Sequence, residues 1–215
     1  MARPSSSPRK RASKSPQDAA RSAFRDELRM AAERMFATNG FAATKMTDIA
    51  READVGVGTL YNYFANKQEI FEEIFATRSV ELEQLIDRAI DGKPPVERIR
   101  LTLRVSLEYL EAHAELFALY AERGGVAEID IERLGGNVIE ERYLQFLRKL
   151  ESSVQAAVDA GDLRGDIPVW TLMAALAGAR NGAAYAWLKG ARNQRLAETS
   201  ETILELFLTG ARPPS

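Results

Sequence analysis

The stretch from Thr44 to Lys67 constrains the fold of this 215-residue chain more than any other part, and it reads TKMTDIAREADVGVGTLYNYFANK. Four apolar residues in its first half recur at the i, i+3, i+4, i+7 spacing of one helix face: Met46, Ile49, Ala50 and Ala53. This stripe predicts a helix of about two turns. The helix is expected to end just before Asp54-Val55-Gly56.

A second short helix is predicted to start near Val57. It buries Val57 or Leu60 together with Phe64, and it leaves five residues facing outward: Gly58, Thr59, Tyr61, Asn62 and Tyr63. This set of residues is unusual on a helix face that contacts only solvent, which indicates that the face binds a partner. Two short helices joined by a tight turn form a helix-turn-helix, whose second helix lies in the major groove of DNA. The stretch therefore predicts a DNA-binding head.

These residues resemble the DNA-binding segment of the tetracycline-repressor (TetR) family of bacterial transcription regulators. The resemblance rests on T-x-x-x-x-I-A followed by V-x-x-G-T-L-Y-x-Y-F-x-x-K, an ordered match with fixed spacing between Thr44 and Lys67. It covers about the first third of the chain, and the rest is matched only by its helical pattern. It implies an all-α fold: a three-helix head with the helix-turn-helix, followed by a helical domain that binds a ligand and forms a homodimer.

The turn departs from the family pattern at two positions. Members commonly carry Gly-Val-Ser where this chain has Asp54-Val55-Gly56. The glycine position is expected to need a left-handed backbone, which aspartate tolerates better than most residues. The serine position caps the second helix, and glycine there costs only a few tenths of a kcal/mol. Both changes leave the motif intact.

The distribution of charge supports a nucleic-acid partner. The chain has a net charge of −2, but residues 1–67 hold 12 of its 29 basic and 7 of its 31 acidic residues, and the remainder holds 17 and 24. A basic head on an acidic body suits a protein that contacts phosphates at one end. Residues 1–18 are rich in Ser, Pro, Arg and Lys, and we expect a disordered basic arm. The arm either contacts DNA or only aids solubility.

The chain divides into three predicted regions: the arm over residues 1–18, the head over 19–67 and the helical domain over 68–215. Asn66, with Glu69 three residues later, marks the start of a long helix that leaves the head and ends at Asp91-Gly92. Later helices are predicted near 95–112, 114–123, 128–160, 168–189 and 194–209, and a break near residues 134–137 is expected to split the third of them. The long helix is the natural lever between head and body.

The family resemblance implies which residues meet DNA. Three residues at the start of the second helix sit deepest in the groove: Val57, Gly58 and Thr59. Further along it Tyr61, Asn62 and Tyr63 lie along the groove wall, and the tyrosines are expected to contact phosphates. Three residues flank the start of the preceding helix, namely Thr44, Lys45 and Thr47, and Lys67 holds the opposite flank. A dimer with two such heads predicts an inverted-repeat operator.

The resemblance also implies a pocket and a dimer interface in the body. The large mid-body side chains expected near a mostly apolar or aromatic ligand are Tyr109, His113, Phe117, Tyr120, Tyr143, Phe146, Trp170 and Met173. Small residues recur every four positions along one ridge of the helix at 168–189, which lets a second helix approach closely. The expected interface residues are Ala174, Gly178, Gly182, Ala186, Leu204 and Phe207, with packing inside one chain as the alternative.

Catalytic and metal chemistry find little support in the composition. The chain has no cysteine and one histidine, His113, so we expect no catalytic residues, no metal site and no cofactor. No signal peptide or membrane span is recognisable, and a cytoplasmic location is expected. The sequence therefore predicts a ligand-responsive transcriptional regulator, and we expect it to be a repressor. A ligand-independent architectural DNA-binding protein is the alternative, and a helical enzyme with an inactive head is a weaker one.

Overall fold

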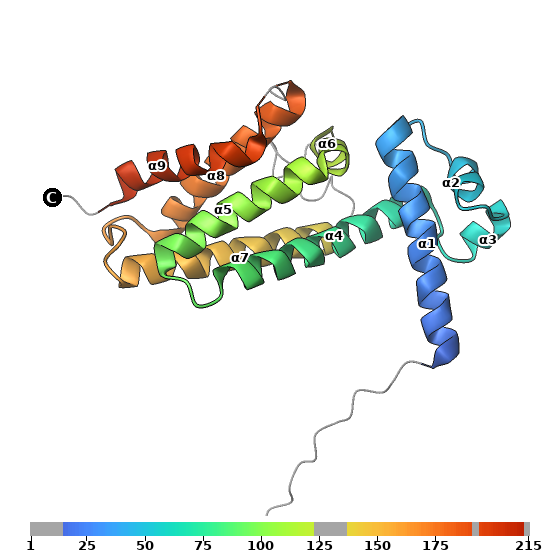
Figure 1. Ribbon diagram of the computed structural model, residues 1–215, viewed down its shortest axis with the longest axis horizontal. Helices are drawn as coiled ribbons and strands as arrows, with labels where there is room; N and C mark the ends of the chain where they lie inside the picture. The colour runs from blue at the N-terminus through green and yellow to red at the C-terminus, as the bar shows by residue number, and fades with distance from the viewer. Residues whose placement is uncertain (1–14, 123–136, 191–193, 213–215) are drawn as a thin grey trace, which may run out of the picture.

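The computed structural model describes residues 15–122, 137–190 and 194–212. All regular secondary structure in these ranges is helical, and they contain no strand, so the predicted all-α class is confirmed. Figure 1 shows a small head of helices at one end and a larger bundle of long helices at the other. A single helix, α4, runs from the head into the bundle.

The first helix of the head, α1, spans Pro16–Asn39. It starts earlier than its apolar pattern predicts because Ser15 and Asp18 form a capping box: the Ser15 hydroxyl accepts from the Asp18 amide at 3.1 Å, and the Asp18 carboxylate accepts from the Ser15 amide at 3.3 Å. Gly40 ends the helix with a φ of 75°. The predicted basic arm lies almost wholly outside the described residues.

Helices α2 (Met46–Glu52) and α3 (Val57–Tyr61) form the helix-turn-helix against α1. Ile49 of α2 and Leu60 of α3 are fully buried beside Phe64. The sequence left open whether α3 is anchored by Val57 or Leu60, and the structure selects Leu60, because Val57 is 39% exposed. The outward face of α3, with Val57 and Tyr61 exposed, is therefore directed away from the core of the head.

The turn between α2 and α3 has the backbone that the sequence predicts. Asp54 has a φ of 55°, and it is the one non-glycine residue with a positive φ in the described ranges. Its amide donates to the Arg51 carbonyl at 3.1 Å, and the Val55 amide donates to the Ala50 carbonyl at 2.9 Å. These bonds reverse the chain within a few residues and set α3 across α2.

Helix α4 (Lys67–Ile90) belongs to both halves of the molecule. Asn66 caps it, since its side-chain oxygen accepts from the Glu69 amide at 3.0 Å. The first turns of α4 bury Ile70, Phe71, Ile74 and Phe75 in the same apolar cluster as Leu28, Ile49 and Leu60 of the head. We therefore propose that the packing unit of the head extends to Phe75, beyond the boundary at residue 67 that the motif suggests.

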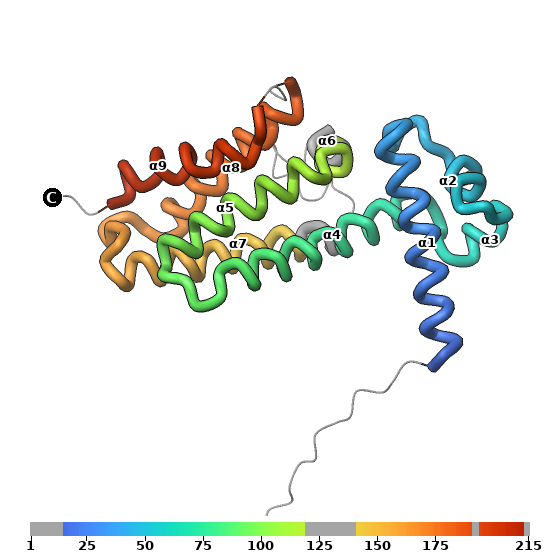
Figure 2. Tube along the Cα trace, in the orientation of Figure 1, coloured from blue at the N-terminus to red at the C-terminus, as the bar shows by residue number. Residues whose placement is uncertain are grey.

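The body packs around α4 and α5, which run side by side in Figures 1 and 2. Its other helices are α5 (Pro95–Ala112), α6 (Ala114–Glu122), α7 (Asn137–Asp159), α8 (Val169–Lys189), a 3-10 turn (Leu196–Glu198) and α9 (Thr199–Ala211). Their bounds lie close to those predicted, and residues 128–136 of the predicted third body helix lie outside the described ranges. Leucines of α5, α7, α8 and α9 are the commonest residues of the body core.

Replacement of Asp54 tests the strain in the turn. Glycine has no Cβ to clash in the left-handed region, so Asp54→Gly is expected to exceed Asp54→Ala in unfolding free energy by about 1 kcal/mol. Thermal or urea unfolding of the two variants measures this difference. Equal stability of the two would show that the turn is not held at a positive φ in solution.

Candidate nucleic-acid interface and ligand pocket

The outward face of α3 carries the side chains predicted to read DNA. Val57, Gly58, Thr59, Tyr61 and Asn62 are all exposed, whereas Leu60 between them is buried. The burial of Leu60 fixes the rotation of α3 about its axis. The exposed side chains combine a methyl surface, a hydroxyl, an amide and a phenol, groups that can contact base edges and phosphates.

Tyr63 differs from the other predicted DNA contacts because it is half-buried against α1. Its ring meets the Phe24 ring edge-on at 5.3 Å between centroids, and the Arg21 guanidinium lies 5.7 Å from its centroid. Its backbone carbonyl accepts from Arg25, which also pairs with Glu69 and Glu73 of α4. Tyr63 thus ties the end of the motif to α1, so its loss is expected to perturb the head as well as any phosphate contact.

Helix α2 contributes a cation that the family motif does not include. Arg51 is largely exposed and borders a shallow depression together with Thr47, Val55 and Val57. It lies one helical turn after Thr47, and that i, i+4 spacing on the polar face of α2 is the signal that can identify it. The Arg51 guanidinium forms an ion pair with the Asp48 carboxylate, with 3.0 Å between Nη2 and Oδ1. Thr47 and Lys45 are exposed as predicted.

Thr44 has a structural role in place of the predicted contact between its side chain and DNA. It is 1% exposed, and its hydroxyl donates to the Gly40 carbonyl at 2.7 Å. A second acceptor, the Met35 carbonyl, lies at 3.2 Å. The side chain therefore fastens the turn between α1 and α2.

Lys67 is likewise committed within the head. Its Nζ donates to the carbonyls of Phe41 at 2.6 Å, Thr44 at 3.0 Å and Ala42 at 3.2 Å. The ammonium group also lies 4.5 Å from the centroid of the Phe41 ring. An ammonium group has three N–H donors, and three carbonyls receive them. Lys67 therefore holds the α1–α2 turn to the start of α4, and it is a positioning residue for the motif.

A hollow lined by α4, α5, α6, α7 and α8 is the candidate ligand pocket. Its cavity volume is about 90 Å³, and the hollow is partly open to solvent. Its apolar lining residues are Phe75, Leu82, Ile86, Leu110, Phe117 and Phe146. The polar and charged lining residues are Ser79, Glu83, Arg142, Tyr143, Gln145, Lys149, Arg180 and Asn181. Its lining, mostly apolar with a few convergent polar and charged groups, is typical of a small-molecule site.

The structure brings together some of the residues predicted for this pocket and separates others. Phe117, Tyr143 and Phe146 line it. Met173 packs against the body core, and Trp170 is 66% exposed on the surface of α8, so neither lines the hollow. The side chain of Tyr120 is outside the part of the chain that the structure describes. The charged residues of the pocket were not predicted from the sequence, because their helical spacing is also that of an ordinary solvated face.

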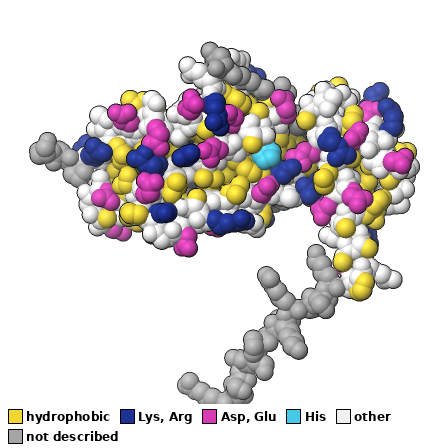
Figure 3. All heavy atoms as spheres, viewed as in Figure 1, with side chains coloured by type: hydrophobic (Ala, Val, Ile, Leu, Met, Phe, Trp, Pro, Cys, Tyr) yellow, Lys and Arg dark blue, Asp and Glu magenta, His cyan; other side chains and the backbone are white. Residues whose placement is uncertain are grey.

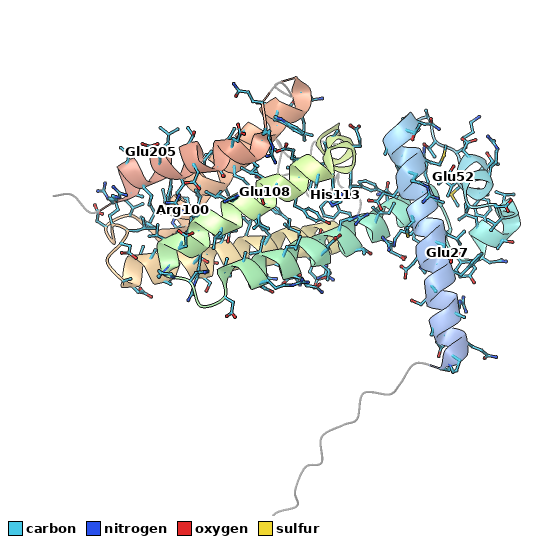
Figure 4. All side chains as sticks on the ribbon, viewed as in Figure 1. Glu27, Glu52, Arg100, Glu108, His113 and Glu205 are labelled. Atoms are coloured by element: carbon cyan, nitrogen blue, oxygen red, sulfur yellow. The ribbon has the colours of Figure 1, made fainter. Side chains whose placement is uncertain are left out.

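Tyr109 and His113 belong to a bridge between head and body. Arg78 of α4 pairs with Glu33 of α1 at 2.8 and 2.9 Å and with Glu81 at 2.9 Å. Glu81 accepts from the Tyr109 hydroxyl at 2.8 Å, and the Tyr109 ring packs on His113 at 4.3 Å between centroids. Figures 3 and 4 place His113 where the body faces the head. The bridge joins α1, α4 and α5.

The bridge shifts the pKa of its members in the directions that its geometry requires. The hydrogen bond from Arg78, aided by that from Tyr109, lowers the pKa of Glu81. Burial, together with the bond to Glu81, raises the pKa of the Tyr109 hydroxyl. Burial lowers the pKa of His113, and the nearby positive charge of Arg78 adds to this effect. Around neutral pH the bridge therefore contains a charged Arg78–Glu81 pair with a neutral tyrosine and a neutral imidazole.

The small-residue ridge of α8 is exposed in the single chain. Ala174, Gly178, Gly182 and Ala186 all face outward, and a Cβ added at either glycine would meet nothing within 4 Å. Leu206 and half-buried Phe207 of α9 add apolar surface. The prediction that Leu204 lies at the dimer interface is wrong. Leu204 is 1% exposed and packs in the core of its own chain, so its side chain cannot serve an interface.

Two negative findings concern the described residues only. They contain no group of three or more His, Asp or Glu side chains placed to hold a metal ion. None of their helices combines the length and the apolar character needed to cross a membrane.

The head and the body together define a helix-turn-helix protein with a separate helical domain. Residues 28–74 match the family model described as bacterial regulatory proteins, tetR family. Residues 28–74 therefore carry the DNA-binding segment of the TetR family, and the chain resembles the DNA-binding transcription regulators of that family.

Curated relatives are similar to this chain in sequence, and solved structures are similar to it in fold. The chain is 29% identical over 135 residues to the uncharacterised HTH-type transcriptional regulator YhgD of Bacillus subtilis, covering 62% of this chain and 69% of that one. It is 28% identical over 167 residues to the probable acrEF/envCD operon repressor of Escherichia coli, covering 76% of each. The fold is similar to that of the regulator FadR from Bacillus subtilis in complex with stearoyl-CoA, with a TM-score of 0.74, 20% identity and coverage of 87% and 99%.

The roles of Lys67 and Lys45 can be separated by salt dependence. A lysine that contacts phosphate adds about 1 to the slope of log affinity against log salt, whereas a positioning lysine adds nothing. Lys67→Met is expected to lower DNA affinity and unfolding free energy, the latter by about 1–3 kcal/mol, and to leave the slope unchanged. Lys45→Met is the matched control and is expected to reduce the slope by about 1. A reduced slope for Lys67→Met would return Lys67 to the DNA interface.

Proposed function

We propose that the protein is a homodimeric repressor that binds an inverted-repeat operator and leaves it when a small, mostly apolar ligand enters the pocket. The DNA-binding part of this proposal rests on the two faces of α3: Leu60 is buried on one face, and Val57, Thr59 and Tyr61 are exposed on the other. A rigidly anchored short helix with this outward face suits insertion into a major groove.

The proposed dimer uses the ridge of α8 and the adjoining face of α9. The open space at Gly178 and Gly182 supports this use, because no described part of the chain requires those positions to be small. Trp170 and Leu206 offer large exposed apolar side chains on the same two helices. Helices at such an interface can approach closely. Two heads held in this way match half-sites about 34–36 Å apart or a multiple of that distance.

Replacement of Gly182 tests this interface. Gly182→Leu adds bulk where the chain itself has space, so the helical circular-dichroism spectrum is expected to stay unchanged while the dimer dissociates. Sedimentation equilibrium measures the association constant, with Gly182→Ala as the control that adds only one methyl group. A Gly182→Leu variant that stays as dimeric as the wild type would place the interface elsewhere.

The ligand half of the proposal rests on the position of the hollow between helices of the body and on its aromatic and aliphatic lining. The similar FadR structure is a complex with stearoyl-CoA, which supports an acyl thioester, or a ligand of like apolar character, for this chain. Phe75, Leu82 and Ile86 of α4 form part of the lining, so a ligand there touches the helix that also enters the head. A ligand releases DNA only if it binds better to the state with displaced heads.

The experiment that tests the DNA-binding proposal is selection of bound sequences from a random duplex library with the purified full-length protein. An enriched inverted repeat would support a sequence-specific dimeric regulator. Enrichment of no sequence, with binding that vanishes in moderate salt, would favour the architectural alternative, in which only phosphates are read.

Variants of α3 refine that test. Tyr61→Phe is expected to weaken binding to all selected sequences by a similar factor of a few-fold, because the hydroxyl is assigned to a phosphate. Val57→Ala is expected to change the preferred bases, because its methyl groups are assigned to a thymine methyl. Mobility shifts on the selected duplex and its single-base variants measure both effects. The reverse pattern would contradict these two assignments.

A further inference from the structure

The charged residues of the pocket form a shared ion-pair cluster between α4 and α7. Lys149 Nζ lies 3.1 Å from Glu83 and also pairs with Asp87. Arg142 Nη1 lies 4.0 Å from the same Glu83, at the outer limit of an ion pair. One carboxylate of α4 therefore faces two cations of α7, and all three side chains line the hollow.

Arg142 is the less satisfied of the two cations. Its guanidinium donates a hydrogen bond to the neutral side-chain oxygen of Gln145 at 2.9 Å. Within the described residues no acid approaches Arg142 more closely than Glu83. A guanidinium group has five N–H donors and binds a carboxylate or phosphate best in a bidentate geometry at about 2.7–2.9 Å. The present geometry leaves most of that capacity unused.

The surroundings make this arrangement more than a solvated surface pair. Leu82 and Ile86 of α4 and Phe146 of α7 line the same hollow. The side chains of Glu83, Arg142 and Lys149 are each 24–33% exposed, so they are partly withdrawn from water. Charges beside apolar walls interact more strongly than charges in water, and they cost free energy unless they are well paired. A cation with a distant partner at this place favours an incoming anion.

We propose that the ligand of this pocket is an amphiphile whose acidic group, a carboxylate or a phosphate, binds Arg142 and Lys149 in exchange for Glu83. The apolar part of the ligand lies against Leu82, Ile86 and Phe146, and the acidic group lies at the two cations. The inference rests on the proposed function insofar as that function places a ligand in this hollow. It adds the charge of the ligand and the residues that select it.

The exchange conserves the number of ion pairs. Glu83 is one-third exposed, so its carboxylate can turn from Lys149 and Arg142 toward water when the acidic group of the ligand arrives. Asp87 continues to pair with Lys149. The ligand anion gains the bidentate contact with Arg142 that Glu83 does not make. Glu83 is thus an internal competitor of the ligand, and its removal is expected to tighten the binding of anions alone.

The test uses three probes with the same twelve-carbon chain and different head groups: dodecanoate, dodecyl phosphate and 1-dodecanol. Titration calorimetry on the full-length protein is expected to give both anions at least about tenfold higher affinity than the alcohol, as for a charge-assisted contact. A preference for only one of the anions identifies its source as carboxylate or phosphate. Equal affinity for all three probes would overturn the proposed anion site while leaving an apolar pocket intact.

Matched variants assign the effect to the cluster. Glu83→Gln keeps the size of the side chain and is expected to raise anion affinity about tenfold with no change for dodecanol. Arg142→Gln is expected to abolish the preference for anions. Arg148→Gln, on an exposed position of α7 outside the hollow, is the control and is expected to change nothing.

The failure of the anion site and the failure of the proposed pocket give different results. Absence of binding by all three probes would overturn the proposed apolar pocket together with the anion site. Unchanged anion affinity in both Glu83→Gln and Arg142→Gln, with dodecanol still bound, would overturn the anion site alone. Circular dichroism of each variant shows whether it is folded, and Glu83→Gln supplies a gain of affinity that misfolding cannot mimic.

Discussion

The burial of the first turns of α4 in the head is the interaction on which the rest of the structure depends. Ile70, Phe71 and Ile74 are fully buried in the apolar cluster that also contains residues of α1, α2 and α3, and the same helix continues without a break to Ile90 among the helices of the body. A continuous helix transmits a rotation or a tilt along its whole length. The position of the motif is therefore set by how the body holds α4, and the pocket is built on that helix.

The sequence predicted the helix-turn-helix well because its rules are local. The apolar stripe of α2, the cap at Asn66 and the left-handed backbone at Asp54 each depend on residues within one or two turns. The choice between Val57 and Leu60 stayed open because helical spacing alone permits either residue to face inward. The apolar cluster of the head decides it, because Leu60 is buried in that cluster and Val57 lies outside it.

The roles of individual side chains could be predicted less well, because they depend on contacts that are distant in sequence. The Lys67 ammonium finds its acceptors at Phe41, Ala42 and Thr44 in the preceding turn, and a family motif shows only that a lysine stands there. Tyr109 was expected in the pocket for its size and place in the body, but Glu81 and His113 draw it to the bridge. Trp170 illustrates the opposite error, since a large aromatic residue was assumed to be covered and is exposed in the single chain.

The bridge from Glu33 through Arg78 and Glu81 to Tyr109 has a consequence for how DNA binding and ligand binding affect each other. It holds a helix of the head and a helix of the body to the same two turns of α4, beside Phe117 of the pocket wall, 6.5 Å from Tyr109 between ring centroids. Energetic coupling between two binding sites is reciprocal by thermodynamic necessity. In the function proposed above, the operator is then an effector of the pocket as much as the ligand is an effector of the head. A protomer bound to DNA then needs a higher ligand concentration to fill its pocket than a protomer free in solution.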